Sequence, residues 1–177
     1  MQLNTLHDVF LHQLTDLHSA EKQLIEALPK MAQAATDREL HAAFTDHLER
    51  TRSHADRLQT ILRNLGDNAP AHKCVGMEGL IREGDEIIRM QGQPAAKDAA
   101  LIGAAQRVEH YEIAGYGTAA SMAKEMGHSD AADLLNQTLD EESQANEKLT
   151  DLAEGGLSGE GINLEANEGE RGRMPSR

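Results

Sequence analysis

Apolar side chains recur every three or four residues in four long stretches of this sequence, with polar side chains between them. This is the spacing of a helix that buries one face, because an α-helix completes a turn in about 3.6 residues. Polar residues interrupt the pattern at Thr36 and Asp37, and a glycine interrupts it at Gly127. Four long helices are therefore predicted, over residues 6–31, 38–65, 98–127 and 129–154.

Residues typical of helix ends lie at the borders of these stretches. Asn4 or Thr5 can cap the first helix, and Asp98 can cap the third, because a short polar side chain accepts a hydrogen bond from the free N–H groups there. Gly66 and Gly127 stand where the second and third helices are expected to stop, since glycine readily adopts the left-handed conformation that ends a helix.

Residues 67–97 separate the second long helix from the third. Gly92 and Pro94 indicate a turn, and the apolar positions over 77–90 predict a short helix. A connection of this length allows the chain to cross the whole bundle before the third long helix begins. We therefore interpret it as a crossover connection that carries a short fifth helix.

The composition changes after Glu154, where glycine, glutamate and arginine replace almost all apolar residues. Such a segment cannot bury enough apolar surface to offset the entropy of ordering it. The expected architecture is all-α, with a four-helix bundle over residues 1–154 and a disordered tail over residues 155–177.

Three of the predicted buried faces contain a glutamate: Glu21 in the first helix, Glu112 in the third and Glu142 in the fourth. Glu109 lies one turn before Glu112 on the same side. An ionised carboxylate in an apolar interior costs several kcal/mol unless a cation or a proton accompanies it. No lysine or arginine lies on these inner faces. Counting the helical rise from the two turns places the three glutamates near the middle of one bundle, where they are expected to converge.

His47 and His54 border the inner face of the second helix. Glutamates with one or two histidines suit iron or manganese, and helical bundles hold two such ions with Glu-x-x-His pairs. The match is partial, because Thr51 precedes His54 and Ala145 follows Glu142 at the positions of the missing partners. His47 either binds metal or supports a ligand. The candidate ligands of two iron ions, or of manganese, are Glu21, Glu109, Glu112, Glu142, His54 and His47.

Tyr116 follows Glu112 by one helical turn on the same face. Its hydroxyl is placed to bond a carboxylate, or to donate a proton or hydrogen bond to a small oxidant, so we consider it a candidate catalytic residue. Cys74 has no second cysteine with which to pair, and we interpret it as a packed thiol.

The charge of the chain limits its partners. Thirty acidic residues against 17 basic ones give a net charge of −13, which disfavours binding to nucleic acid or to an anionic membrane. No apolar run approaches the roughly 18 residues of a membrane span, and the N-terminus lacks the pattern of a secretory signal, so a cytoplasmic location is expected. The residues interpreted as solvated surface of the second helix are Glu49, Arg50, Arg52 and Arg57.

Three segments resemble the YciF-type bacterial stress-protein family: LHSAEKQL at 17–24, CVGMEGLI at 74–81 and VEHYEIA at 108–114. The resemblance covers nearly all of residues 6–153. It implies a ferritin-like helical bundle related to rubrerythrins, a metal site, a homodimer and a link to stress responses. The family's metal site is carried over most directly onto Glu21, Glu109, Glu112 and Glu142.

Two classes of function follow from these observations. The first is a ferritin-like stress protein whose di-iron or di-manganese carboxylate site acts on peroxide, oxygen or ferrous iron, as a peroxidase, catalase or ferroxidase does. The second is a non-catalytic stress or scaffold protein without metal, whose carboxylates are protonated or bonded to Tyr116, Thr138 and Thr51. An iron-storage cage is a third possibility, because the sequence neither shows nor excludes the contacts that it needs.

Overall fold

The computed structural model describes residues 2–66, 72–156 and 159–171. All the regular elements of this part of the chain are α-helices. They are α1 (Leu6–Ala34), α2 (Arg38–Asn64), α3 (Val75–Arg89), α4 (Pro94–Glu125), α5 (Ser129–Glu154) and α6 (Ile162–Arg171). The four long helices and the short crossover helix predicted from the sequence are confirmed.

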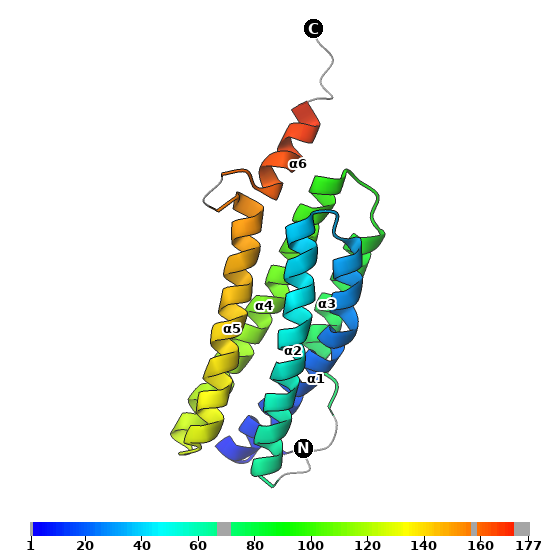
Figure 1. Cartoon of the computed structure of the whole chain (residues 1–177). Coiled ribbons are helices and arrows are strands. Elements are labelled where there is room, and N and C mark those ends of the chain that lie inside the picture. Colours follow the sequence, from blue (N-terminus) through cyan, green and yellow to red (C-terminus); the bar gives the residue numbers. More distant parts are fainter. Residues whose placement is uncertain (1, 67–71, 157–158, 172–177) are drawn as a thin grey trace.

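The long helices α1, α2, α4 and α5 lie side by side as a bundle (Figure 1). Short turns join α1 to α2 and α4 to α5, so that each of these pairs is antiparallel. Helices α2 and α4 run in the same direction, because the connection between them returns along the bundle through α3. Helix α3 packs against α1 and α4, outside the four-helix bundle.

The expected end signals of α1, α2 and α4 are present. The Thr5 hydroxyl accepts a hydrogen bond from the Asp8 N–H at 3.2 Å, and the Asp8 carboxylate accepts one from the Thr5 N–H at 2.8 Å. This reciprocal pair satisfies two of the free donors at the start of α1. Gly66 and Gly127 follow α2 and α4 with φ angles of 69° and 74°, a conformation that other residues rarely adopt.

Asp98 does not cap its own helix, which corrects the prediction. Helix α4 begins a turn earlier at Pro94, where proline fits because the first N–H groups of a helix have no partner within it. Asp98 is 1% exposed, and its carboxylate accepts hydrogen bonds from the N–H groups of Thr36 at 2.9 Å and Asp37 at 2.8 Å. It therefore joins the α1–α2 turn to α4, a long-range contact that the local sequence pattern does not reveal.

The segment after Glu154 also differs from the expectation, because part of it forms α6. Ile162 at the start of α6 is 6% exposed and packs in the same cluster as Leu149 and Leu152 of α5. Glycines allow the described backbone on either side of this connection to approach closely. Gly155 has a φ of 89°, and a Cβ atom at Gly161 would overlap the carbonyl oxygen of Ala153. The glycines at 155 and 161 therefore allow the end of α5 and the start of α6 to lie in close contact.

A layer of polar side chains divides the buried core of the bundle into two apolar clusters. On α1, Glu21 lies between Leu17 of one cluster and Leu24 of the other, and on α4 Glu112 lies between Tyr116 and Val108 in the same way. The upper cluster of Figure 1 includes Leu24, Leu28, Leu40, Phe44, Leu101, Val108, Leu149 and Ile162. The lower cluster includes Phe10, Leu14, Leu17, Leu58, Tyr116, Ala119 and Leu135.

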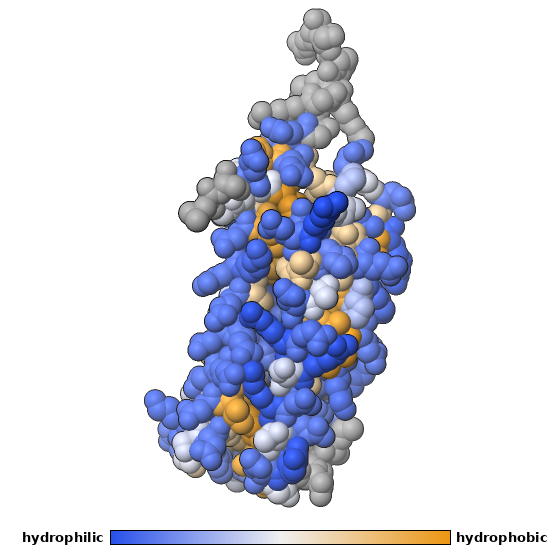
Figure 2. Space-filling model, in the orientation of Figure 1, coloured by the Kyte–Doolittle hydropathy of each residue, from blue (hydrophilic) through white to orange (hydrophobic). Residues whose placement is uncertain are grey.

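Hydrophilic side chains cover most of the face shown in Figure 2, as the acidic composition suggests. None of the described helices has both the length and the apolar character needed to cross a membrane. The exposed large hydrophobic side chains among the described residues are Leu3, Leu6, Val75, Met90 and Leu164.

The start of α3 is fixed to α1 and α4 by hydrogen bonds. Cys74 is fully buried, and its thiol lies 3.0 Å from the Tyr111 hydroxyl and 3.1 Å from the Asp16 carboxylate. Tyr111 also donates a hydrogen bond to Asp16 at 2.9 Å. The Tyr111 ring can approach this closely because residue 76 is glycine: a Cβ atom there would lie 2.8 Å from the ring. These contacts give Cys74 and Gly76 of the 74–81 segment a structural role in placing α3.

Two glycines of α3 are expected to respond in opposite ways to alanine. Gly79→Ala should stabilise the protein by about 0.5–1 kcal/mol, because alanine favours a helix and no atom lies within 4 Å of the new Cβ. Gly76→Ala should destabilise it by about 1–3 kcal/mol, because the Tyr111 ring must move from its hydrogen bonds. Urea unfolding followed by circular dichroism measures both changes. Equal effects of the two substitutions would contradict the close packing at Gly76.

Candidate metal centre

The six predicted ligand residues come together in the polar layer at the middle of the bundle. Glu21, Glu112 and Glu142 are 0% exposed and Glu109 is 3% exposed. His54 is fully buried and His47 is 7% exposed, so both lie deeper than the border of the inner face on which the sequence placed them. We call these six residues the carboxylate layer. Each long helix contributes at least one of them: α1, α4 and α5 contribute the glutamates, and α2 contributes the two histidines.

The first group of possible ligands consists of Glu21, His54 and Glu142, and its donor atoms lie within 4.8 Å of one another. His54 Nδ1 is 2.8 Å from Glu142 Oε1 and 3.5 Å from Glu21 Oε1. The buried Tyr116 hydroxyl donates a short hydrogen bond to Glu21 Oε1. Tyr116 is therefore a partner of the Glu21 carboxylate. The second oxygen of that carboxylate, Glu21 Oε2, has no hydrogen-bond partner and is available to bind a metal ion.

The second group consists of His47, Glu109, Glu112 and Glu142, again with donor atoms within 4.8 Å of one another. His47 Nε2 lies 3.4 Å from Glu109 Oε1 and 3.7 Å from Glu142 Oε2. Glu142 belongs to both groups and presents one oxygen to His54 and the other to His47. The two groups thus share a carboxylate, as expected of two adjacent metal positions.

Most donor atoms of this layer make no well-formed hydrogen bond, although His54 Nδ1 and Glu142 Oε1 lie 2.8 Å apart. Among the described residues, ten buried side-chain N and O atoms have no hydrogen-bond partner, and nine of them belong to the carboxylate layer. Buried polar atoms without partners are rare because each costs about 1–3 kcal/mol. Hard oxygen donors with two imidazoles fit iron or manganese. The nine atoms are Glu21 Oε2, Glu109 Oε2, His54 Nδ1, both oxygens of Glu112 and Glu142, and both nitrogens of His47.

Burial and mutual repulsion favour the protonated forms of three carboxylates in this layer. Burial raises the pKa of Glu109 and Glu112 well above the usual range, and neighbouring carboxylates raise both further. Burial also raises the pKa of Glu21 to about 7. Burial alone would lower the pKa of His54, but its contacts with Glu142 and Glu21 outweigh that effect and raise it to about 10. A divalent cation would replace these protons and neutralise the carboxylates directly.

Glu142 and His47 respond differently to burial. Burial opposes ionisation of Glu142, yet its contacts with His54 and His47 outweigh that cost and lower the pKa. Burial lowers the pKa of His47, so its imidazole favours the neutral form that can bind a metal ion. The salt bridges of Glu21, Glu109 and Glu142 with other described residues involve only these two histidines.

Glu141 is part of this site and was missed by the sequence reasoning. Its carboxylate lies 2.8 Å from His54 Nε2 and accepts hydrogen bonds from Arg57 at 2.7 and 2.9 Å. Burial would raise the pKa of Glu141, but Arg57 and His54 outweigh it and lower the pKa to about 2. The ionised Glu141 holds His54 with Nε2 outward and Nδ1 toward Glu142, an arrangement typical of metal-binding histidines. Arg57 is therefore half-buried in a network, which corrects its interpretation as solvated surface.

The two threonines proposed as partners of the carboxylates have other partners. The Thr51 hydroxyl donates to the His47 carbonyl oxygen at 2.9 Å. The Thr138 hydroxyl donates to the Leu134 carbonyl oxygen at 3.3 Å and accepts from Arg57 at 3.1 Å. Neither hydroxyl therefore satisfies a carboxylate of the layer.

A cavity of about 430 Å³, partly open to solvent and lined by both charged and apolar side chains, reaches the second ligand group between α2, α4 and α5. We call it the polar cavity. His47 and Glu109 form part of its wall, and Arg50 and Lys148 are exposed residues of its lining. Ala145 lines the same cavity at the position where a Glu-x-x-His pair would have its histidine. Because alanine is small, ions and water have a path to His47 and Glu109.

The sequence matches the family described as "Domain of unknown function (DUF892)" over residues 5–165. The chain belongs to this family. This DUF892 chain is 47% identical over 154 residues to Protein YciF of Escherichia coli strain K12, which covers 86% of the chain and 93% of YciF. The family resemblance recognised in the sequence is thereby confirmed.

Solved structures support the fold of this DUF892 chain. The crystal structure of the E. coli stress protein YciF has a TM-score of 0.81 and 46% identity, and the match covers 85% of this chain and 95% of that one. YcfI of Rhodopseudomonas palustris has a TM-score of 0.81 and 42% identity over 84% of this chain and 95% of its own. A Xanthomonas campestris protein at 19% identity, with a TM-score of 0.71 over 96% of this chain and 100% of its own, shows the fold alone.

Proposed function

We propose that this protein is a ferritin-like stress protein that holds two iron or manganese ions in the carboxylate layer and acts on peroxide, oxygen or ferrous iron. The observation that carries the proposal is the convergence, from four helices, of nine buried donor atoms that make no well-formed hydrogen bond and lie close to one another. Similarity to the E. coli stress protein YciF supports a role in stress. We include in the proposal a cytoplasmic location and a homodimer. Light scattering of the purified protein would test the homodimer.

Glu21, His54 and Glu142 would hold one ion, and His47, Glu109, Glu112 and Glu142 the other. Bound iron or manganese would supply a redox-active centre with a coordination position open to a small oxidant. Glu142 would bind both ions, since its two oxygens face the two groups. The carboxylates would give up their protons when the ions bind.

Tyr116 and Glu141 would support the chemistry from opposite sides of the first group. The Tyr116 hydroxyl orients Glu21 through its hydrogen bond to Oε1. The proton of this hydroxyl would lie beside the metal site. Glu141 orients His54 and, with a side chain that is 22% exposed, connects the buried imidazole with the surface. Tyr116 is the residue that we assign to proton donation, and Glu141 is a positioning residue.

The alternative of a metal-free scaffold protein has one observation in its favour, because the similar YcfI is described as a proposed structural protein. That alternative requires the buried carboxylates to be satisfied by protons and hydroxyl groups. Of the three hydroxyl groups considered, only that of Tyr116 bonds a carboxylate of the layer. The metal-binding proposal accounts for the remaining atoms.

Metal content tests the proposal directly. Protein purified without an affinity tag or chelator should contain about two iron or manganese ions per chain by mass spectrometry. Glu112→Ala should retain about one ion, because Glu112 belongs to one group, and Glu142→Ala should retain none, because Glu142 belongs to both. Circular dichroism of each variant checks that the bundle remains folded.

Glu49→Ala is the matched control, because Glu49 has a side chain that is 66% exposed and pairs with Arg52 on the surface of α2. It should bind as much metal as the unsubstituted protein. Full metal retention by Glu142→Ala would overturn the assignment of the ligands. Protein that contains no metal and does not take up added iron or manganese would favour the scaffold alternative.

A further inference from the structure

Glu109 lines two cavities that differ in polarity. On one side it faces the polar cavity between α2, α4 and α5. On the other side it lines a smaller cavity of about 40 Å³ that lies between α1, α3 and α4. This second cavity, which we call the α3 cavity, has no role in the function proposed above.

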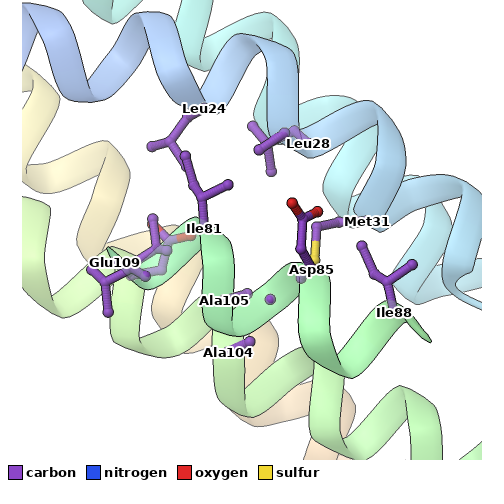
Figure 3. Close-up of a pocket in the computed structure, with 13 residues that line it drawn as sticks. Leu24, Leu28, Met31, Ile81, Asp85, Ile88, Ala104, Ala105 and Glu109 are labelled. Atoms are coloured by element: carbon purple, nitrogen blue, oxygen red, sulfur yellow. The ribbon is translucent and has the colours of Figure 1, made fainter. Parts of the chain in front are cut away.

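The wall of the α3 cavity is almost entirely apolar. Leu24 and Leu28 of α1 and Ile81 of α3 surround the space, with Glu109 at one end and Ile88 at the other (Figure 3). The lining residues with a charged side chain are Asp85 and Glu109. Helix α3 forms one wall of this cavity, and because Ile81, Asp85 and Ile88 are partly exposed, the cavity is partly open to solvent. The contacts of Cys74 and Tyr111 fix the start of that wall.

The size and polarity of the α3 cavity select its occupant. Water is held stably only where it finds two to four polar partners, and the α3 cavity, which is partly open to solvent, offers charged side chains only from Asp85 and Glu109. An engineered apolar cavity of roughly 150 Å³ accommodates benzene, and the α3 cavity, at about 40 Å³, is much smaller. A small apolar molecule of two atoms fits these limits.

We infer that the α3 cavity binds dioxygen and delivers it to the carboxylate layer at Glu109. Its delivery role rests on the proposed function, whereas the binding of a small apolar gas does not. Ions, water and peroxide would reach Glu109 and His47 through the polar cavity, because they need polar partners along the way. The two paths thus separate the reactants by polarity and meet at one carboxylate.

Xenon tests the binding step without any metal, because it is an apolar atom that occupies dry cavities. A crystal of the metal-free protein under xenon pressure should show anomalous density between Leu24, Ile81 and Ala105. Absence of xenon from this place overturns the inference. It leaves the proposed function intact, since metal content is measured separately.

Gly84 provides the variant that fills the cavity. A Cβ atom at Gly84 would lie 3.6 Å from Met31 Sδ, an ordinary contact, so alanine fits and a larger side chain extends into the cavity. Gly84→Leu should exclude xenon, whereas Gly84→Ala, the matched control, should reduce its occupancy less. Retention of full xenon occupancy by a folded Gly84→Leu variant contradicts the position of the site.

The delivery step is tested with protein loaded anaerobically with ferrous iron. Gly84→Leu should slow oxidation by dioxygen about tenfold, because the remaining path requires transient opening of packed helices, and should leave oxidation by peroxide unchanged. Ala145→Leu, in the polar cavity, should slow ferrous iron uptake and oxidation by peroxide but leave xenon binding unchanged. Equal rates with dioxygen in Gly84→Leu and the unsubstituted protein would overturn delivery through the α3 cavity.

Discussion

Glu112→Met is expected to stabilise the metal-free protein by about 1–3 kcal/mol, although it removes a residue of the proposed centre. Glu112 is fully buried and neither of its oxygens has a hydrogen-bond partner. Methionine has a similar length and keeps the space filled with an apolar side chain. The free energy of unfolding is measured by urea titration in the presence of a chelator, and metal content is measured on the same preparations.

The opposite effects on stability and on metal binding distinguish the two functions considered. In a scaffold protein the carboxylate would stabilise the fold through its own hydrogen bonds, and its replacement would destabilise the bundle. In a metal-binding protein the Glu112 carboxylate would destabilise the metal-free fold, and its role would be to bind the metal ion. Glu49→Met serves as the exposed control and should change stability by less than about 0.5 kcal/mol. Destabilisation of the metal-free protein by Glu112→Met would contradict the metal-binding proposal.

The metal-free protein is also expected to lose stability as the pH rises from about 5 to about 8. The pKa of Glu21 rises from its usual 4.5 to about 7 on folding, so the folded state holds an extra proton between these values. The free energy of unfolding therefore falls across this interval, by about 3 kcal/mol for Glu21 alone. Glu109 and Glu112, with pKa values that are also raised, extend the decline in the same direction.

The remaining titrating groups set the limits of this pH interval. His54 has a pKa raised to about 10 in the folded state, so its stabilisation is also lost as the pH rises through that value. Glu142 and Glu141 have lowered pKa values, and their stabilisation is lost as the pH falls below about 4.5. The lowered pKa of His47 acts in the opposite direction to the raised pKa of Glu21 below about pH 6.5. Stability of the metal-free protein should therefore be greatest between about pH 5 and pH 6.5.

Bound metal should remove the loss of stability that the metal-free protein shows as the pH rises. Its ligands must be deprotonated, so metal affinity and the stabilisation that comes with it increase with pH. Urea unfolding at several pH values, with a chelator and with added manganese, provides both curves. Equal stability of the metal-free protein at pH 5 and pH 8 would show that the carboxylates are satisfied by fixed hydrogen bonds.

The helices and the inward glutamates were predictable because both depend on the spacing of residues along one chain. Glu21, Glu112 and Glu142 occupy positions that would otherwise be apolar, and that interruption is visible in the sequence. Their depth follows from the constant rise of the helix. The convergence of these glutamates could therefore be predicted before their side chains were seen, whereas the binding of ions is part of the proposal.

Features that depend on contacts between helices were not predictable in this way. Glu141 is adjacent to Glu142 on α5, and only its pairing with Arg57 and His54 of α2 shows its role. Asp98 has the sequence pattern of a helix cap, but the free N–H groups that it satisfies belong to a turn about sixty residues earlier. The two cavities at Glu109 depend on how three or four helices pack, which no single periodicity specifies.

The division of the core by the carboxylate layer affects how the bundle opens. Without metal, the upper and lower apolar clusters would lie on either side of a layer that holds few hydrogen bonds, and we expect each half to fluctuate open separately. Ions held by all four long helices would join the halves into one cooperative unit. Amide hydrogen exchange and proteolysis would then slow together when metal binds. The lifetime of the protein in a cell would thus depend on the supply of its own metal.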